Sequence, residues 1–253
     1  MIVQRAAGEE PRFVMTLDDH LEVASQIAAA FGNQSFARPE PWPLVQFVAR
    51  HHDAGWEDVD ADPPQNPETG LPCSLGRTPW PALLAIPAAS AEYNERHHPL
   101  CGLLVSMHYT GLYRGRFGLV SAHAIADVPA QWRPEVDRML AHEDARQDRL
   151  RRVLQADPEA VMHAYFCLQF FDLLALHFNL NPQGAPVAGS FARVPTSAAA
   201  SVTIAVAPAL PGGFTLSPWP FAGDELTLRC RGAYQRPRGD AEAGEQAFTL
   251  RAV

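Results

Sequence analysis

The apolar residues in the first half of the chain are spaced as in helices. Thr16-Leu-Asp-Asp19 has the form of a capping box, in which a Thr side chain and an acidic side chain satisfy free N–H groups at a helix start. Apolar positions then recur on one face as far as Phe31, and Gly32 ends the pattern. We therefore predict a helix over 16–32, with His20 at the head of its buried stripe.

Further helices are predicted to begin near residues 41, 81, 99, 134 and 159. Proline marks several of these starts, as is common in the first turn of a helix. The helix over 134–156 is charged on most faces, so we expect it to face solvent. The helix over 159–179 is the most apolar, yet it places Asp172 on its core stripe. This element must therefore bury a carboxylate.

Two other segments have no helical period. Residues 57–80 are rich in proline and acidic residues, which predicts a long irregular loop. Its aspartates at 58, 60 and 62 do not form a calcium loop of the EF-hand kind, because Pro63 stands where that loop needs Gly. From about residue 182 the composition shifts to Ala, Pro, Gly, Ser and Val, and alternation at 202–206 and 225–229 predicts strands.

These elements predict a mainly α fold with a small antiparallel β-sheet. We expect a helical metal-site domain over 1–182, with a short hairpin in its first 16 residues. The remainder, 183–253, would be a linker over 183–200 and a β-rich extension packed on the same domain. The N-terminal strands can join this small sheet.

The composition excludes several functions. A net charge of −8 argues against a nucleic-acid binder that neutralises phosphates. The chain has no Lys, which excludes Schiff-base chemistry and a P-loop. Its four Cys are far apart, so neither a thiolate zinc site nor a disulfide framework is indicated. The chain opens without a signal-peptide core and holds no uninterrupted run of 18 apolar residues, so we expect a cytoplasmic protein without a membrane partner.

Four residues stand out as candidate metal ligands: His20, His52, Asp53 and Asp172. An ionised carboxylate costs several kcal/mol to bury unless it is paired, and an Arg or a metal would have to pair Asp172. Imidazoles and carboxylates together suit Mn, Fe, Ni, Co or Zn. Each residue also has a structural explanation, since His20 can bond within its helix turn, Asp172 can pair with an Arg, and His108 can be a core histidine.

The order His, then His-Asp, then a distant Asp on a later helix resembles the HD superfamily of metal-dependent phosphohydrolases. The resemblance implies an HD-domain-like helical core in which His20, His52, Asp53 and Asp172 bind a divalent metal. Members with additional histidines hold two ions, and His98 and His108 are the candidates for the second, with His108 favoured over His97 or His98.

A closer resemblance covers nearly the whole chain, to the bacterial domain-of-unknown-function family 3891. It rests on 1–5, 52–56 with Asp60, 66–72, 104–113, 169–172 and 218–221. This family supplies no reaction.

The resemblance to HD enzymes implies a hydrolase of a small phosphorylated substrate that uses one or two ions. Asp53 and His108 would be catalytic, with His108 donating a proton, and Arg114, Arg116 and Trp56 would contact the substrate. Two alternatives stay open: a non-catalytic ligand-binding or structural protein with the HD-like fold, and a di-iron oxygenase of HD type. A homo-oligomer is also open.

Overall fold

The computed structural model describes residues 1–6, 10–115, 128–209 and 213–253. Its helices are α1 (Leu17–Ala30), α2 (Trp42–His51), α3 (Glu57–Ala61), α4 (Trp80–His97), α5 (Pro99–Arg114), α6 (Arg133–Leu154) and α7 (Pro158–Leu180). Its strands are β1 (Ile2–Val3), β2 (Arg12–Met15), β3 (Gly189–Pro195), β4 (Ser201–Pro208), β5 (Phe214–Ser217), β6 (Glu225–Gln235) and β7 (Ala241–Ala252).

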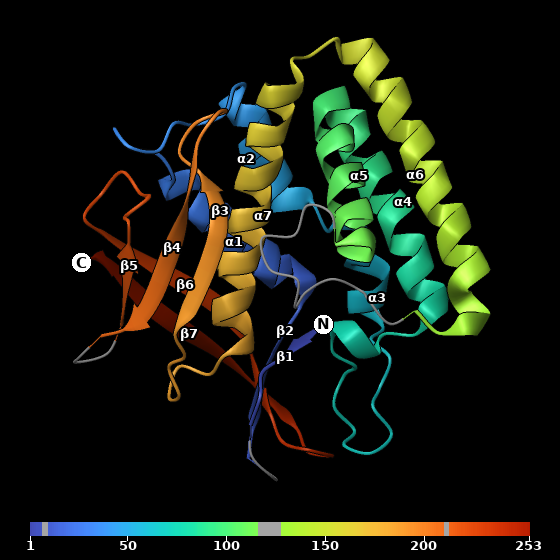
Figure 1. Cartoon of the computed structure of the whole chain (residues 1–253). Helices are drawn as coiled ribbons and strands as arrows, with labels where there is room; N and C mark the ends of the chain where they lie inside the picture. The colour runs from blue at the N-terminus through green and yellow to red at the C-terminus, as the bar shows by residue number, and fades with distance from the viewer. Residues whose placement is uncertain (7–9, 116–127, 210–212) are drawn as a thin grey trace.

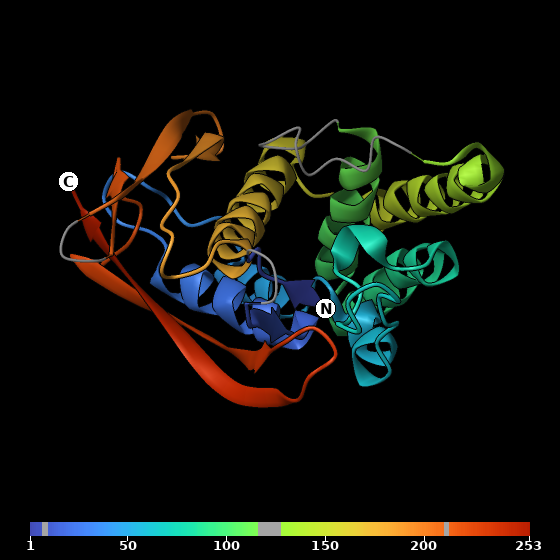
Figure 2. The ribbon, with the colours of Figure 1, turned by 90° about the horizontal axis from the view of Figure 1, so that it is seen from below.

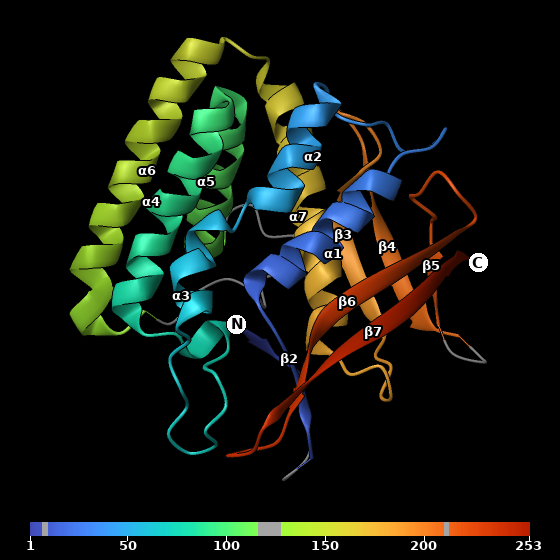
Figure 3. The same ribbon diagram turned by 180° about the vertical axis from the view of Figure 1, so that it is seen from behind.

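The strands form one curled sheet in the order β1-β2-β6-β7-β5-β4-β3. Neighbouring strands are antiparallel except β5 and β7, which run parallel. Helices α1 and α7 lie between this sheet and the group formed by α4, α5 and α6 (Figure 1). From behind, β6 runs along α1 (Figure 3), and the curl of the sheet around the two inner helices is clearest from below (Figure 2).

The prediction of a mainly α, or all-α, fold with a small antiparallel sheet is therefore wrong. The sheet has seven strands and is mixed, so the fold is α+β. The predicted linker over 183–200 contains β3, whose alternation is interrupted by a register shift between Phe191 and Val194. Arg193 has a φ of 60° at this bulge. An extra residue breaks the period-2 pattern from which a strand is recognised.

The predicted helices agree more closely with the structure. Thr16 and Asp19 form the capping box at the start of α1. The helices predicted near 41, 81, 99, 134 and 159 correspond to α2, α4, α5, α6 and α7. The N-terminal hairpin is also present, and β2 joins it to the sheet through β6. The loop predicted over 57–80 is interrupted by α3, so that prediction is wrong for its first five residues.

Helix α7 lies at the centre of the protein. By length and composition it passes the test for a membrane span, but 78% of the tested window is buried inside the protein, as in the core helix of a globular fold. Phe170 and Phe171 are fully buried and pack against Phe31 at the end of α1. This packing fixes α7 against α1 and thereby places Asp172 beside His20.

Candidate metal centre

Five side chains from four parts of the chain meet in the interior. Helix α1 supplies His20, the turn after α2 supplies His52 and Asp53, α5 supplies His108, and α7 supplies Asp172. The three histidines are at most 2% exposed and Asp172 is 5% exposed. The structure thus brings together the four residues expected to bind a first metal, and it adds His108 to them.

The distances within this His/Asp cluster are those of ligands around one cation. Asp172 Oδ1 lies 3.1 Å from His20 Nε2 and 3.7 Å from His52 Nε2. Asp53 Oδ2 lies 3.9 Å from the same His52 atom. Ligands about 2.0–2.2 Å from a metal are separated from one another by roughly 3–4 Å. The donor atoms therefore need little movement to coordinate an ion.

Hydrogen bonds on the far side of each ring orient the two histidines. His52 Nδ1 donates to the carbonyl of Ala49 at 3.2 Å, and His20 Nδ1 lies 2.8 Å from Asn179 Oδ1. The Asn179 side-chain amide donates to Cys230 Sγ, so its oxygen is the atom that accepts from His20. Both rings then present Nε2 to the cluster, as metal-binding histidines with a bonded outer nitrogen do.

His52 Nε2 is the atom that points most directly to a missing partner. It is buried and has no hydrogen-bond partner among the described residues. The two carboxylate oxygens that face it lie beyond hydrogen-bond distance. A buried polar atom without a partner is costly, and a cation held between His52, Asp53 and Asp172 would remove that cost.

The charges of the cluster shift the pKa values of its members. Burial opposes the protonation of His52, but the carboxylates of Asp53 and Asp172 outweigh it and raise the pKa of His52 to about 9. Burial likewise opposes the ionisation of Asp172, but its hydrogen bond with His20 and the charge of nearby His52 hold its pKa well below the usual range. Burial lowers the pKa of His108, which favours its neutral form.

Asp53 is held by a short chain of hydrogen bonds. The Tyr109 hydroxyl donates to Asp53 Oδ1 at 2.6 Å, and Ser90 Oγ lies 3.1 Å from that hydroxyl. Ser90 in turn accepts from the backbone N–H of Gly55 at 2.9 Å. Asp53 Oδ2 is left to face His52.

Two overlapping groups of ligand atoms can be drawn within the cluster. His20, His52 and Asp53 bring one donor each within 4.8 Å of one another, as do His52, His108 and Asp172. His52 belongs to both groups. His108 Nδ1 lies 3.1 Å from Gln169 Nε2, so the ring is fixed by α7. Each group offers three possible ligands to one ion, and the two groups share His52.

The structure does not bring the other candidates into the cluster. His98 caps α5, where its Nδ1 accepts from the backbone N–H of Leu100, so it is not placed to bind a second metal. Its neighbour His97 stacks on Phe47. Arg114 is occupied by a two-pronged pair with Asp144 at 2.6 Å.

The two remaining candidates for substrate contact are Trp56 and Arg116. Trp56 is 6% exposed and lies among the core residues, and its contact with substrate stays a prediction. Arg116 lies outside the described residues.

Sequence reasoning missed three residues that position members of the His/Asp cluster: Tyr109, Gln169 and Asn179. Tyr109 follows His108 directly, and Gln169 precedes Asp172 by three residues on α7. Asn179 comes seven residues after Asp172, a spacing that returns to the same helical face. This spacing was the one signal that could have identified a polar partner on the core stripe.

The fold and the cluster together define an α+β protein with a buried centre of three histidines and two aspartates. The chain belongs to the family described as "Protein of unknown function (DUF3891)", whose model matches residues 1–234. The predicted membership of this family is thus confirmed. No curated protein and no solved structure matches the chain. The function has to be argued from the geometry of the cluster.

Proposed function

We propose that the protein is a metal-dependent hydrolase of the HD type that acts on a small phosphorylated substrate. The observation that carries the proposal is His52 Nε2, a buried nitrogen without a partner that lies between the carboxylates of Asp53 and Asp172. His20, then His52-Asp53, then Asp172 is the ligand order that resembles the HD superfamily. In that superfamily such residues bind a catalytic metal.

The donor set suits a divalent transition metal. Imidazole nitrogens combined with carboxylate oxygens favour Mn, Fe, Ni, Co or Zn over Ca or Mg alone. When bound, such a cation lowers the pKa of a coordinated water and polarises a phosphoryl oxygen. His20, His52, Asp53 and Asp172 would hold the first ion, and His108 completes its shell or helps to hold a second.

The other roles follow from exposure and charge. Asp53 has the most exposed carboxylate of the cluster, with a side chain 12% exposed, so water and substrate would approach from its side. Tyr109 keeps that carboxylate in place by donating to Oδ1. Neutral His108 is better suited to ligating an ion than to donating a proton, because burial disfavours its charged form.

The test combines metal analysis with isosteric variants. The purified protein, reconstituted in turn with Mn, Fe, Ni, Co and Zn, should hold about one or two ions, and Asp53→Asn and Asp172→Asn should lose most of that content. Asp62→Asn, which changes an exposed aspartate outside the cluster, is the matched control and should keep the metal. With the preferred metal, hydrolysis of phosphate monoesters should fall at least about 100-fold in both cluster variants.

One observation favours a second candidate, a non-catalytic protein with a structural metal. His20, His52, His108 and Asp172 are all nearly enclosed, and a structural metal is enclosed by its protein ligands. Metal binding that depends on Asp53 and Asp172 without any turnover of phosphate esters would support this candidate. Failure of every metal to bind would refute both.

A further inference from the structure

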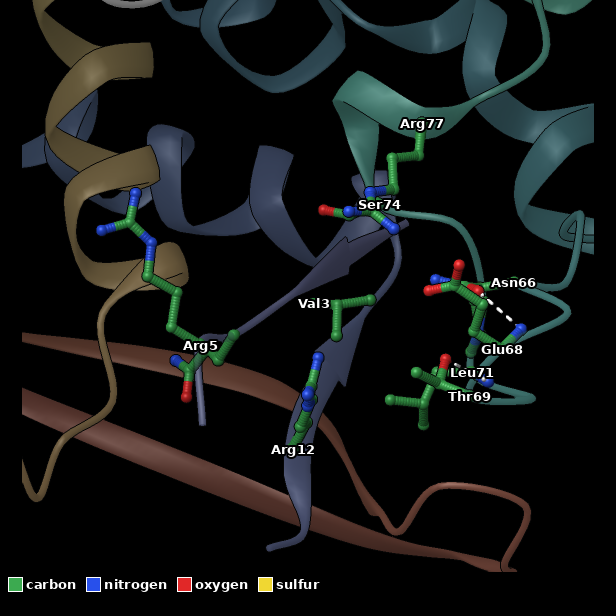
Figure 4. A pocket seen from close by; sticks show the side chains of 11 residues that line it. Val3, Arg5, Arg12, Asn66, Glu68, Thr69, Leu71, Ser74 and Arg77 are labelled. Atoms are coloured by element: carbon green, nitrogen blue, oxygen red, sulfur yellow. Dashed lines mark hydrogen bonds between the residues drawn. The ribbon is translucent and has the colours of Figure 1, made fainter. Parts of the chain in front are cut away.

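A second candidate site lies away from the His/Asp cluster, where the N-terminal strands face the loop after α3. It is a cavity of about 340 Å³. Its walls come from residues 3–5 and Arg12 on one side and from the segment 66–77 on the other (Figure 4). No residue of the His/Asp cluster lines it.

Two of the stretches that carry the family resemblance meet in this cavity. The opening Met1-Ile-Val-Gln-Arg5 supplies Val3, Gln4 and Arg5, and Asn66-Pro-Glu-Thr-Gly-Leu-Pro72 supplies most of the opposite wall. The proposed hydrolase chemistry uses neither stretch. Because both stretches line one cavity, they can contribute to one binding site.

The wall formed by 66–72 is built in advance of any ligand. The backbone N–H of Asn66 donates to the Leu71 carbonyl at 2.8 Å, and the N–H of Gly70 donates to the Asn66 carbonyl at 2.7 Å. Gly70 has a φ of 68°, a left-handed conformation that favours glycine. Leu71 is only 2% exposed and anchors the turn. A preformed wall spares a ligand the cost of ordering it.

The charge of the cavity is positive although the whole protein is negative. Arg5, Arg12 and Arg77 line it against one carboxylate, Glu68. Within the described part of the chain, none of the three arginines is paired with an acidic side chain. The Nε of Arg12 is buried and has no hydrogen-bond partner among the described residues. A buried guanidinium N–H without an acceptor calls for one from a ligand.

We propose that this cavity binds a small molecule carrying a phosphate group or paired carboxylates. A planar guanidinium donates two parallel hydrogen bonds to either group, which makes Arg the side chain suited to both. Arg12 supplies the buried donor, Arg5 and Arg77 add positive charge to the lining, and Ser74 adds a hydroxyl. The site does not depend on a metal in the His/Asp cluster.

The test is calorimetric titration of the whole chain with inorganic phosphate and, separately, with malonate, at low salt. Wild type should bind at least one probe with a Kd of about 1 mM or tighter. Arg12→Gln and Arg77→Gln should each weaken binding about tenfold or more, because each removes a charge-assisted hydrogen bond. Arg152→Gln, which removes an exposed arginine from α6, is the control and should bind as wild type does.

Two further measurements separate this site from its alternatives. The Asp172→Asn variant should keep its affinity for the probe, which distinguishes the cavity from the metal cluster. Melting temperatures show whether the arginine variants fold. Tighter binding of phosphate or of malonate identifies the source of the anion, and either supports the proposal. Absence of saturable binding by both probes, or equal weakening in Arg152→Gln, overturns it.

Discussion

At the scale of single residues, His52 and Asp53 are adjacent in sequence but lie in very different surroundings. His52 is fully buried, and its outer nitrogen is bound to the backbone of α2. Asp53 is reached from the other side by Tyr109 of α5. Because α2 ends just before them, the chain changes direction and the two adjacent side chains point at one place. The site therefore depends on positioning residues as much as on ligands.

The Tyr109→Phe variant tests how far the Tyr109 hydroxyl positions Asp53. Losing the hydroxyl frees Asp53 Oδ1, so we expect metal affinity to fall about 10- to 100-fold while the fold is retained. Metal titration monitored by competition with a chelating dye measures the change. Tyr113→Phe is the matched control, because Tyr113 lies on the same helix outside the hydrogen-bonded chain around Asp53. Equal affinity in Tyr109→Phe and wild type would contradict the role given to Tyr109.

The pKa of His52 predicts how pH acts on the metal-free protein. A histidine whose pKa rises from 6.5 to about 9 on folding stabilises the fold while it is protonated. That contribution is complete below about pH 6.5 and is lost as the pH rises through about 9. The difference in unfolding free energy between wild type and His52→Gln should therefore shrink over this range.

Chemical denaturation after chelation, repeated across the pH series, measures this difference. His142→Gln, which changes an exposed histidine, should show no such trend. A constant gap between wild type and His52→Gln would mean that Asp53 and Asp172 do not hold a proton on His52.

The members of the His/Asp cluster could be predicted from sequence because they carry their own signals. His20 and Asp172 interrupt apolar stripes, and a buried polar residue on such a stripe needs an explanation. Tyr109 could not be predicted, because its acceptor Asp53 lies 56 residues away and only the packing of α5 brings them together. His98 lies outside the cluster because a histidine before a proline at a helix start can cap that helix instead.

At the scale of elements, the turn after α2 is pressed closely against α4. A Cβ on Gly55 would lie 2.6 Å from the Ile86 carbonyl and 2.7 Å from Ser90 Oγ. Any side chain there pushes the turn away from Ser90, the residue that supports Tyr109. The glycine in His52-Asp-Ala-Gly-Trp56 is thus explained by this close approach.

Gly55→Ala should destabilise the protein and loosen the metal site together. We expect a loss of about 1–3 kcal/mol in unfolding free energy, the usual cost of overpacking. Gly76→Ala is the control, since nothing lies within 4 Å of its added Cβ. Denaturant unfolding and metal titration of both variants test this expectation. A Gly55→Ala protein as stable as Gly76→Ala would show that the turn can move at no cost.

The elements themselves were predictable where local signals agree. The capping box of α1 and the proline-marked starts of α2 and α5 are contained within a few residues. Strand β3 was missed because its bulge breaks alternation, and β5 is only four residues long. The parallel pairing of β5 with β7 depends on residues about 36 positions apart, as in Phe214 and Leu250, which no local pattern reveals.

At the scale of the whole molecule, one sheet joins segments from both ends of the chain. Strands β1 and β2 continue into β6, and β7 lies between β6 and β5. The match to the family model ends at residue 234, within β6, although β7 is a central strand of this sheet. The sheet packs on α1 and α7, so it also supports the two helices that carry His20 and Asp172.

The position of β7 has a consequence for synthesis on the ribosome. Helices α1 to α7 emerge first and can begin to pack. Strands β5 and β6 each pair with β7 along one edge, and these edges stay unpaired until residues 241–252 have left the exit tunnel. Until then the nascent chain presents unpaired strand edges, which are the parts of a protein most prone to wrong association. The emergence of β7 pairs both edges, and we expect the nascent chain to depend on chaperones most strongly just before that moment.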